Sequence, residues 1–181
     1  MGQDKAFLNV DGVPMIQRIL TLFTRLFREN LIITNDPAPY QGLKTKTLRD
    51  LFPNRGALGG LYTGLFFSSF HYSFCVACDM PFLKEKLIEY LLGRIDSYSA
   101  IVPRTADGLQ PLHSLYSKDC LEPIARTVRE GKSKIIDFYP LVKIRVVDEN
   151  EFLFLDPLKE SFTNINTPED LDQIRGTRNP S

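Results

Sequence analysis

The amino-acid sequence predicts a three-layer α/β fold in which helices cover both faces of a mainly parallel β-sheet. Short apolar runs of the kind that form buried strands alternate with longer segments whose apolar residues recur at three- and four-residue spacing. The 181 residues contain no internal repeat and no low-complexity segment that would indicate another architecture. This alternation of strand and helix patterns is typical of sheets covered on both sides by helices.

Five segments have the sequence features of helices. Four of them carry an amphipathic stripe, over residues 15–27, 56–66, 87–95 and 121–128. Pro14 stands where proline is favoured, at the start of the first helix. The fifth helix begins at Thr167, a capping residue, followed by Pro168 in the first position and Asp170 three residues after the cap.

Six short runs have the composition of strands, and polar residues follow several of them. The runs cover residues 31–34, 45–48, 74–77, 100–102, 112–116 and 142–147. In α/β sheets, ligands bind at the carboxyl ends of the strands. The residues that follow apolar runs, and that we therefore expect near a ligand, are Asn35, Asp50, Asp79 and Asn166.

The composition excludes several classes of protein. Hydrophobic residues make up 43% of the chain and charged residues 24%, which indicates a globular rather than a disordered protein. Lysine plus arginine equals aspartate plus glutamate at 22 each, so we expect no general binding to nucleic acid or to anionic membranes. The most apolar stretch, residues 61–78, is too interrupted to span a membrane. The odd number of cysteines (Cys75, Cys78 and Cys120) and the polar N-terminus predict a reduced, cytoplasmic protein.

Asp79 is the first candidate for a functional side chain. It directly follows the strand pattern at residues 74–77 and precedes Pro81, so its carboxylate would point toward the ligand edge of the sheet. A carboxylate in that place suits Mg²⁺ held against phosphates. The alternative is that Asp79 caps a helix that starts near Phe82.

Two weaker candidates lie near the ends of the chain. Gly2 and Lys5 precede the first helix and could hold a phosphate, although a lysine in such a position is usually only solvated. Asn164 and Asn166 stand at alternate positions of a strand end, so their side chains point to one side. The alternative is a strand-to-helix turn whose polar side chains satisfy backbone groups.

Four motifs, in their order and spacing, resemble the molybdenum cofactor guanylyltransferase family. They are Met1-Gly2-Gln3-Asp4-Lys5-Ala6, Cys78-Asp79-Met80-Pro81, Gln110-Pro111-Leu112-His113 and the run from Asn164 to Leu171. The resemblance covers essentially the whole chain and implies a single Rossmann-like nucleotidyltransferase domain over residues 1–181. It also implies an enzyme that transfers GMP from GTP to molybdopterin (the molybdenum cofactor) and releases pyrophosphate.

The resemblance further implies roles for individual residues. Lys5 would contact the nucleotide phosphates and Asp79 would hold Mg²⁺ against them, which makes these two the expected catalytic residues. Asn35 and Asp50 would complete the GTP-binding site. The candidates for the acceptor side are Asn164, Asn166 and Gln110.

The resemblance begins inside the family's opening motif, L-A-G-G-x-S-x-R-M-G-x-D-K-A. The chain matches it only from Met1-Gly2 onward, so we expect the domain to lack the glycine-rich phosphate loop and the first strand before it. Each neighbouring backbone group left buried and unpaired would cost about 1–3 kcal/mol. We therefore expect Met1 to be an internal methionine of a longer natural protein, and the 181 residues alone to show poor or no turnover.

Two other functions stay open. One is a cytidylyltransferase or sugar-phosphate nucleotidyltransferase of the same superfamily, although cytidylyl relatives tend to carry aspartates where Asn164 and Asn166 stand. The other is a non-catalytic adaptor that binds molybdopterin without the phosphate loop. The expected partners are GTP and molybdopterin, with transient contacts to molybdenum cofactor biosynthesis proteins and target molybdoenzymes, and with neither nucleic acid nor membrane.

Overall fold

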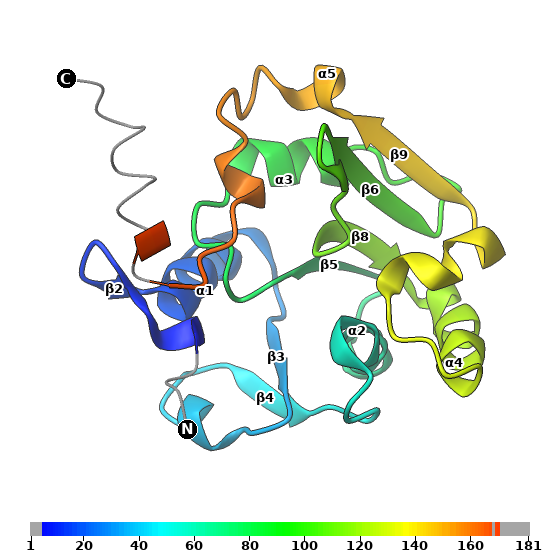
Figure 1. Cartoon of the computed structure of the whole chain (residues 1–181), viewed down its shortest axis with the longest axis horizontal. Coiled ribbons are helices and arrows are strands. Elements are labelled where there is room, and N and C mark those ends of the chain that lie inside the picture. The colour runs from blue at the N-terminus through cyan, green and yellow to red at the C-terminus, as the bar shows by residue number, and fades with distance from the viewer. Residues whose placement is uncertain (1–4, 168, 171–181) are drawn as a thin grey trace.

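The computed structural model describes residues 5–167, 169 and 170, which form an α/β protein (Figure 1). The α-helices are α1 (Met15–Leu26), α2 (Gly56–Phe67), α3 (Glu85–Leu92), α4 (Leu121–Arg129) and α5 (Glu149–Phe152). The strands are β1 (Asn9–Val10), β2 (Val13–Pro14), β3 (Leu31–Thr34), β4 (Lys46–Arg49), β5 (Tyr72–Val76), β6 (Ala100–Thr105), β7 (Gly108–Leu109), β8 (His113–Ser117) and β9 (Ile144–Asp148). Short 3-10 helices are η1 (Lys5–Phe7), η2 (Ala38–Tyr40), η3 (Lys118–Cys120), η4 (Ile135–Leu141) and η5 (Glu160–Phe162).

The strands of the described residues form one five-stranded sheet and two strand pairs. The larger sheet has the order β5-β8-β6-β7, and β9 pairs with residues Ala100–Arg104 of β6. β3 pairs with β4, and β1 pairs with β2. In Figure 1 the β3–β4 pair lies apart from the larger sheet, on the far side of β5 from β8.

The predicted α/β fold class is confirmed, whereas the sheet is mixed rather than mainly parallel. β3–β4 and β6–β9 are parallel, but β8 pairs antiparallel with both β5 and β6. The reason lies in the short β6–β7 hairpin, which reverses the chain without a crossover helix. Because a parallel neighbour would need such a crossover, the strand that follows the hairpin returns antiparallel.

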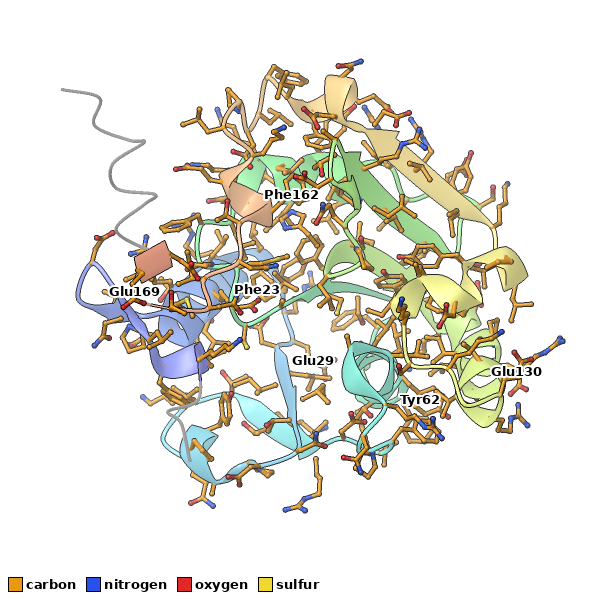
Figure 2. All side chains as sticks on the ribbon, in the orientation of Figure 1. Phe23, Glu29, Tyr62, Glu130, Phe162 and Glu169 are labelled. Carbon is orange, nitrogen blue, oxygen red and sulfur yellow. The ribbon has the colours of Figure 1, made fainter. Side chains whose placement is uncertain are left out.

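Two apolar clusters on opposite faces of the larger sheet establish the three layers. Ala100 and Val102 of β6 belong to a cluster with α2, α4 and η4. Ile101, between them in the sequence, belongs to a second cluster with α3 and α5. Successive strand residues face opposite sides, so β6 is buried on both faces. The side chains in Figure 2 occupy the space between these layers.

The first four predicted helices and the six predicted strands are present, with ends displaced by a few residues, as is usual for element boundaries. At the predicted start of the last helix, the backbone N–H of Asp170 donates to Thr167 Oγ1 at 3.3 Å, which confirms the predicted cap. Pro168 and residues 171–181 lie outside the described residues. No helix in the described part of the chain combines the length and the apolar character needed to cross a bilayer.

The β1–β2 hairpin was missed, although the sequence carries a signal for it. Asp11 and Gly12 connect the two strands and have φ angles of 52° and 81°. Two central residues with positive φ define the hairpin turn that Asp-Gly favours. The strands are only two residues long, so their apolar pattern is too short to be recognised.

Candidate functional site

Three polar side chains from distant parts of the sequence meet at the carboxyl end of β5. Lys5 Nζ donates a hydrogen bond to Asn166 Oδ1 at 2.6 Å, across 161 positions of sequence. The backbone N–H of Ile165 donates to the carbonyl oxygen of Asp79 at 2.8 Å, which joins the segment of Asn166 to the turn that carries Asp79. The sequence predicted Lys5, Asp79 and Asn166 as site residues, and the structure brings these three together.

The carboxyl group of Asp79 is half-buried and one of its oxygens is sheltered from solvent. That atom, Oδ1, has no hydrogen-bond partner among the described residues. Burial raises the pKa of Asp79, and the nearby positive charge of Lys5 opposes the increase. A sheltered, unpartnered oxygen is costly unless a further group binds it. The capping alternative does not hold for α3, because the residue that precedes this helix is Lys84.

The segment that carries the two predicted asparagines is held by an internal anchor and a cap. Ile165 is completely buried, whereas Asn164 and Asn166 on either side of it are exposed. The carboxylate of Asp170 accepts the backbone N–H groups of Asn166 at 2.7 Å and Thr167 at 2.9 Å. These donors lower the pKa of Asp170. The predicted strand-to-helix turn and the predicted site therefore coincide in this segment.

Asn35 and Asp50 follow the neighbouring strands β3 and β4, at one end of this parallel pair. The backbone N–H of Asp50 donates to the carbonyl oxygen of Thr34 at 3.1 Å, which extends the pairing by one step. Asn35 is exposed, but Asp50 is only 9% exposed. Asp50 Oδ1 accepts hydrogen bonds from the backbone N–H of Phe52 at 2.9 Å and from Thr63 Oγ1 at 2.8 Å. Asp50 therefore fixes the loop between β4 and α2.

Gly59 allows this loop to lie directly on the first turns of α2. A Cβ atom at Gly59 would stand 2.7 Å from the carbonyl oxygen of Phe52 and 2.8 Å from Asp50 Oδ2. Thr63, one helical turn later, accepts the backbone N–H of Leu51 at 3.0 Å in addition to its bond with Asp50. The sequence analysis missed Thr63, because no local pattern links it to a residue thirteen positions earlier.

Gln110 is not part of this cluster. The side-chain amide of Gln110 donates to Thr105 Oγ1 at 2.9 Å, within the β6–β7 hairpin. Its backbone carbonyl oxygen accepts from Ser114 Oγ at 2.6 Å, so Gln110 stabilises the turn into β8. Gly2 lies outside the described residues.

A metal ion at this site would depend on one carboxylate. Among the described residues, no group of three or more His, Cys, Asp or Glu side chains could hold a metal ion. Asp79 and the amide oxygens of the asparagine segment could supply hard oxygen ligands at the end of β5. Mg²⁺ in particular keeps several waters and binds through one or two carboxylates plus substrate phosphates, so the set is compatible with it.

The fold and this site define a nucleotidyltransferase-type α/β enzyme. In agreement, the family model described as the MobA-like NTP transferase domain matches residues 1–143. A probable molybdenum cofactor guanylyltransferase of Pelotomaculum thermopropionicum is 37% identical over 177 residues, which cover 97% of this chain and 85% of the relative. A molybdenum cofactor guanylyltransferase of Desulfosudis oleivorans is 36% identical over 173 residues, which cover 95% of this chain and 86% of that relative.

The solved structure of molybdopterin-guanine dinucleotide biosynthesis protein A from Archaeoglobus fulgidus has the same fold. It superposes with a TM-score of 0.83 at 23% identity, over 98% of this chain and 91% of the other. The chain belongs to the molybdenum cofactor guanylyltransferase family. The predictions of family, fold class and enzyme class are thus confirmed.

Proposed function

We propose that this chain transfers the guanylyl group of GTP to the terminal phosphate of molybdopterin, with Mg²⁺ at Asp79. The observation that carries the proposal is the meeting of Lys5, Asp79 and Asn166 at the carboxyl end of β5, in a member of this family. In the reaction, a phosphate oxygen of molybdopterin forms a bond to the α-phosphorus of GTP. The bond from that phosphorus to the leaving pyrophosphate breaks.

The reaction requires charge neutralisation and alignment of the reacting phosphates more than it requires proton transfer. The second pKa of a phosphate monoester is about 6, so the acceptor is largely a dianion at neutral pH and needs no strong base. Bound Mg²⁺ would neutralise the phosphates. In this proposal Lys5 holds the triphosphate through its ammonium group, and Asp79 orients the ion through its sheltered oxygen. Such fixed charges act with little reorganisation during the reaction.

The other predicted site residues have separate roles in the proposed reaction. Asn35 is an exposed polar group on the GTP side. Asp50 contributes by fixing the loop that ends at α2, since its Oδ1 is already engaged by Phe52 and Thr63. The candidates for the molybdopterin side are Asn164, Asn166 and Gln110.

We also propose that residues 1–181 belong to one nucleotidyltransferase domain. We further propose a cytoplasmic location, because an odd number of cysteines favours a reducing compartment. Partners other than GTP and molybdopterin would be transient.

Nucleotide-dependent stabilisation tests the proposal. The thermal unfolding of a chain extended by the family's opening motif would be followed with GTP or CTP, each with and without Mg²⁺. We expect GTP with Mg²⁺ to raise the Tm more than CTP does. Asp79→Asn should lose the Mg²⁺-dependent part, whereas Asp107→Asn, in the exposed β6–β7 turn, should retain it. Equal responses to the two nucleotides, or an unchanged response in Asp79→Asn, would contradict the proposal.

A further inference from the structure

A small apolar cluster adjoins the polar site at the end of β5. Its buried members are Val10, Met15, Phe82 and Ile165, and Leu8 packs against them. They come from β1, from α1, from the loop between β5 and α3, and from the segment that carries the two asparagines. In Figure 1 this last segment passes beside α1. The set, which we call the Ile165 cluster, therefore joins four separate parts of the chain.

Lys5 and Asp79 are each connected to the Ile165 cluster by a short stretch of backbone. The backbone N–H of Leu8 donates to the carbonyl oxygen of Lys5 at 3.0 Å, and the carbonyl oxygen of Leu8 accepts the N–H of Met15 at 2.9 Å. Asp79 precedes Phe82 by three residues, and Phe82 is only 6% exposed. A shift of either backbone stretch would therefore disturb the packing of the cluster.

Ile165 connects the asparagine segment both to the cluster and to the turn of Asp79. Among residues 164–167, all of which the structure describes, Ile165 alone is buried. Its backbone N–H donates to the carbonyl oxygen of Asp79 at 2.8 Å. The next residue, Asn166, accepts the hydrogen bond from Lys5. One residue thus combines an apolar anchor with a hydrogen bond to the turn that carries the candidate metal ligand.

The polar bonds of this segment are weaker restraints than the burial of Ile165. The bond from Lys5 to Asn166 is exposed, so water competes for both groups. The carboxylate of Asp170 accepts the N–H groups of Asn166 and Thr167, which fixes the shape of the local turn but not its place on the fold. Burying a large aliphatic side chain contributes more than an exposed hydrogen bond does. Ile165 therefore supplies most of the stabilisation that keeps the segment beside Asp79.

We propose that Ile165 is a positioning residue, which holds the Asn166 amide and the Asp79 carboxyl group in one site by anchoring their backbone segments in the shared cluster. This inference rests on the proposed function, in which phosphates and Mg²⁺ occupy that site. Catalysis by alignment and fixed charges requires such groups to keep their separation, since a misplacement of about 1 Å can slow a reaction roughly 100-fold. Ile165 acts only through its neighbours, because its own side chain is buried.

Amide hydrogen exchange without metal or nucleotide tests the anchoring directly. In Ile165→Ala, the protection factor of the residue 165 N–H should fall at least about tenfold, because the segment can then leave Asp79 by local opening. Ile165→Val keeps the branched shape and most of the buried surface, so it should reduce the protection much less. Ile165→Thr places a hydroxyl group in the cluster and should act in the same direction as Ile165→Ala, which keeps the test valid if the alanine variant does not fold.

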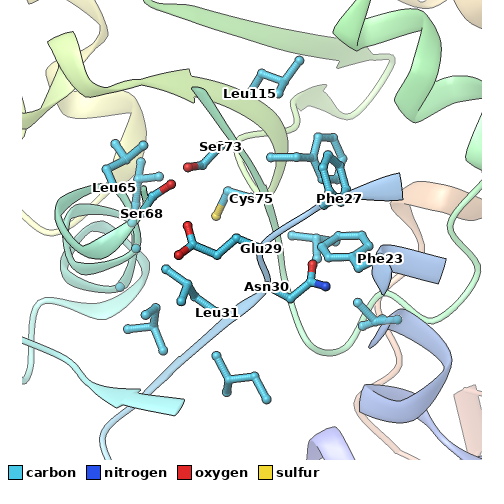
Figure 3. Close-up of a pocket in the computed structure, with 18 of the residues that line it drawn as sticks. Phe23, Phe27, Glu29, Asn30, Leu31, Leu65, Ser68, Ser73, Cys75 and Leu115 are labelled. Carbon is cyan, nitrogen blue, oxygen red and sulfur yellow. The ribbon is translucent and has the colours of Figure 1, made fainter. Parts of the chain in front are cut away.

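Leu65→Ala is the matched control, because leucine and isoleucine lose the same atoms on truncation to alanine. Leu65 is 1% exposed and belongs to a different apolar cluster. It lies on α2 beside a groove of about 660 Å³ between β3 and β5 (Figure 3). Leu65→Ala should lower the Tm by roughly 5–15 °C and leave the protection factor at residue 165 unchanged. If Ile165 contributed only to general stability, the two alanine variants would behave alike.

Line broadening by Mn²⁺ alone tests whether the anchoring matters to the site. Mn²⁺ broadens the NMR signals of nearby amides, and the effect falls steeply with distance. In the unmodified chain we expect the amide signals of both Asp79 and Asn166 to broaden. In Ile165→Ala the Asp79 signal should still broaden, whereas the Asn166 signal should become sharp. Both signals should broaden in Ile165→Val and in Leu65→Ala.

The possible results separate this inference from the proposed function. Unchanged protection of the residue 165 N–H in Ile165→Ala and Ile165→Thr, or an equal loss in Leu65→Ala, would overturn the inference. Broadening of Asn166 that persists in Ile165→Ala would also overturn it, while leaving the proposed metal site intact. If Mn²⁺ broadens neither signal in the unmodified chain, metal binding at Asp79 in the proposed function fails, and the exchange result alone decides the role of Ile165.

Discussion

The substitution Gly59→Ala tests how closely the β4–α2 loop lies on α2. The new Cβ atom would stand 2.7 Å from the carbonyl oxygen of Phe52, which is a backbone atom. Phe52 cannot withdraw freely, because its own N–H is bound to Asp50 Oδ1 at 2.9 Å. The methyl group therefore forces the loop away from the helix and disturbs the buried bond between Asp50 and Thr63.

The magnitude follows from a comparison with Gly60, the next residue of the same helix. Alanine at either position gains up to about 1 kcal/mol in helix propensity. At Gly60 the nearest atom to the new Cβ is Ile33 Cγ2 at 4.0 Å, so no clash opposes that gain. At Gly59, overpacking costs about 1–3 kcal/mol. Since the propensity terms cancel, Gly59→Ala should be less stable than Gly60→Ala by about 1–3 kcal/mol.

Urea unfolding followed by circular dichroism, together with thermal melts, would measure this difference. For a chain of this size, each kcal/mol corresponds to a change in Tm of about 2–4 °C. We expect Gly60→Ala to melt at or above the temperature of the unmodified chain, and Gly59→Ala to melt below it. If Gly59→Ala proves as stable as Gly60→Ala, the close approach of the loop to α2 is refuted.

Two further predictions concern buried polar groups. Thr63→Val should lower the free energy of unfolding by about 1–3 kcal/mol, because it removes one of the two donors to Asp50 Oδ1 and leaves the Leu51 N–H without its partner, whereas Thr63→Ser should lose much less; urea titration distinguishes the two. Burial lowers the pKa of His113 to about 3, so the folded state excludes a proton that the unfolded state binds below about pH 6.5. The stabilisation by neutral His113 is fully present above about pH 6.5. Below that pH the free energy of unfolding should decrease by up to about 1.4 kcal/mol per pH unit, down to about pH 3. Urea unfolding across this pH range would measure the decrease. His113→Phe should make the free energy of unfolding depend less on pH, whereas His71→Gln, at an exposed position, should not. An unchanged pH dependence in His113→Phe would contradict the assignment of this effect to His113.

Patterns in the sequence were sufficient to predict the helices, the longer strands and the family. The apolar stripe of residues 15–27 and the cap at Thr167 are local features, and each appears in the structure where the sequence predicts it. The position of Asp79 at the end of a strand is equally local, since it requires only an apolar run and the residue after it. Such predictions succeed because the interactions concerned join residues a few positions apart.

Contacts between distant residues were decided only by the tertiary structure. The bond from Lys5 to Asn166 closes a cluster across almost the whole chain, and the bond from Thr63 turns Asp50 inward. The antiparallel insertion of β8 and the groove between β3 and β5 likewise depend on how separate elements pack. A linear pattern records which face of an element is apolar, but it does not record which other element covers that face. Packing and strand pairing between elements far apart in the sequence make that choice.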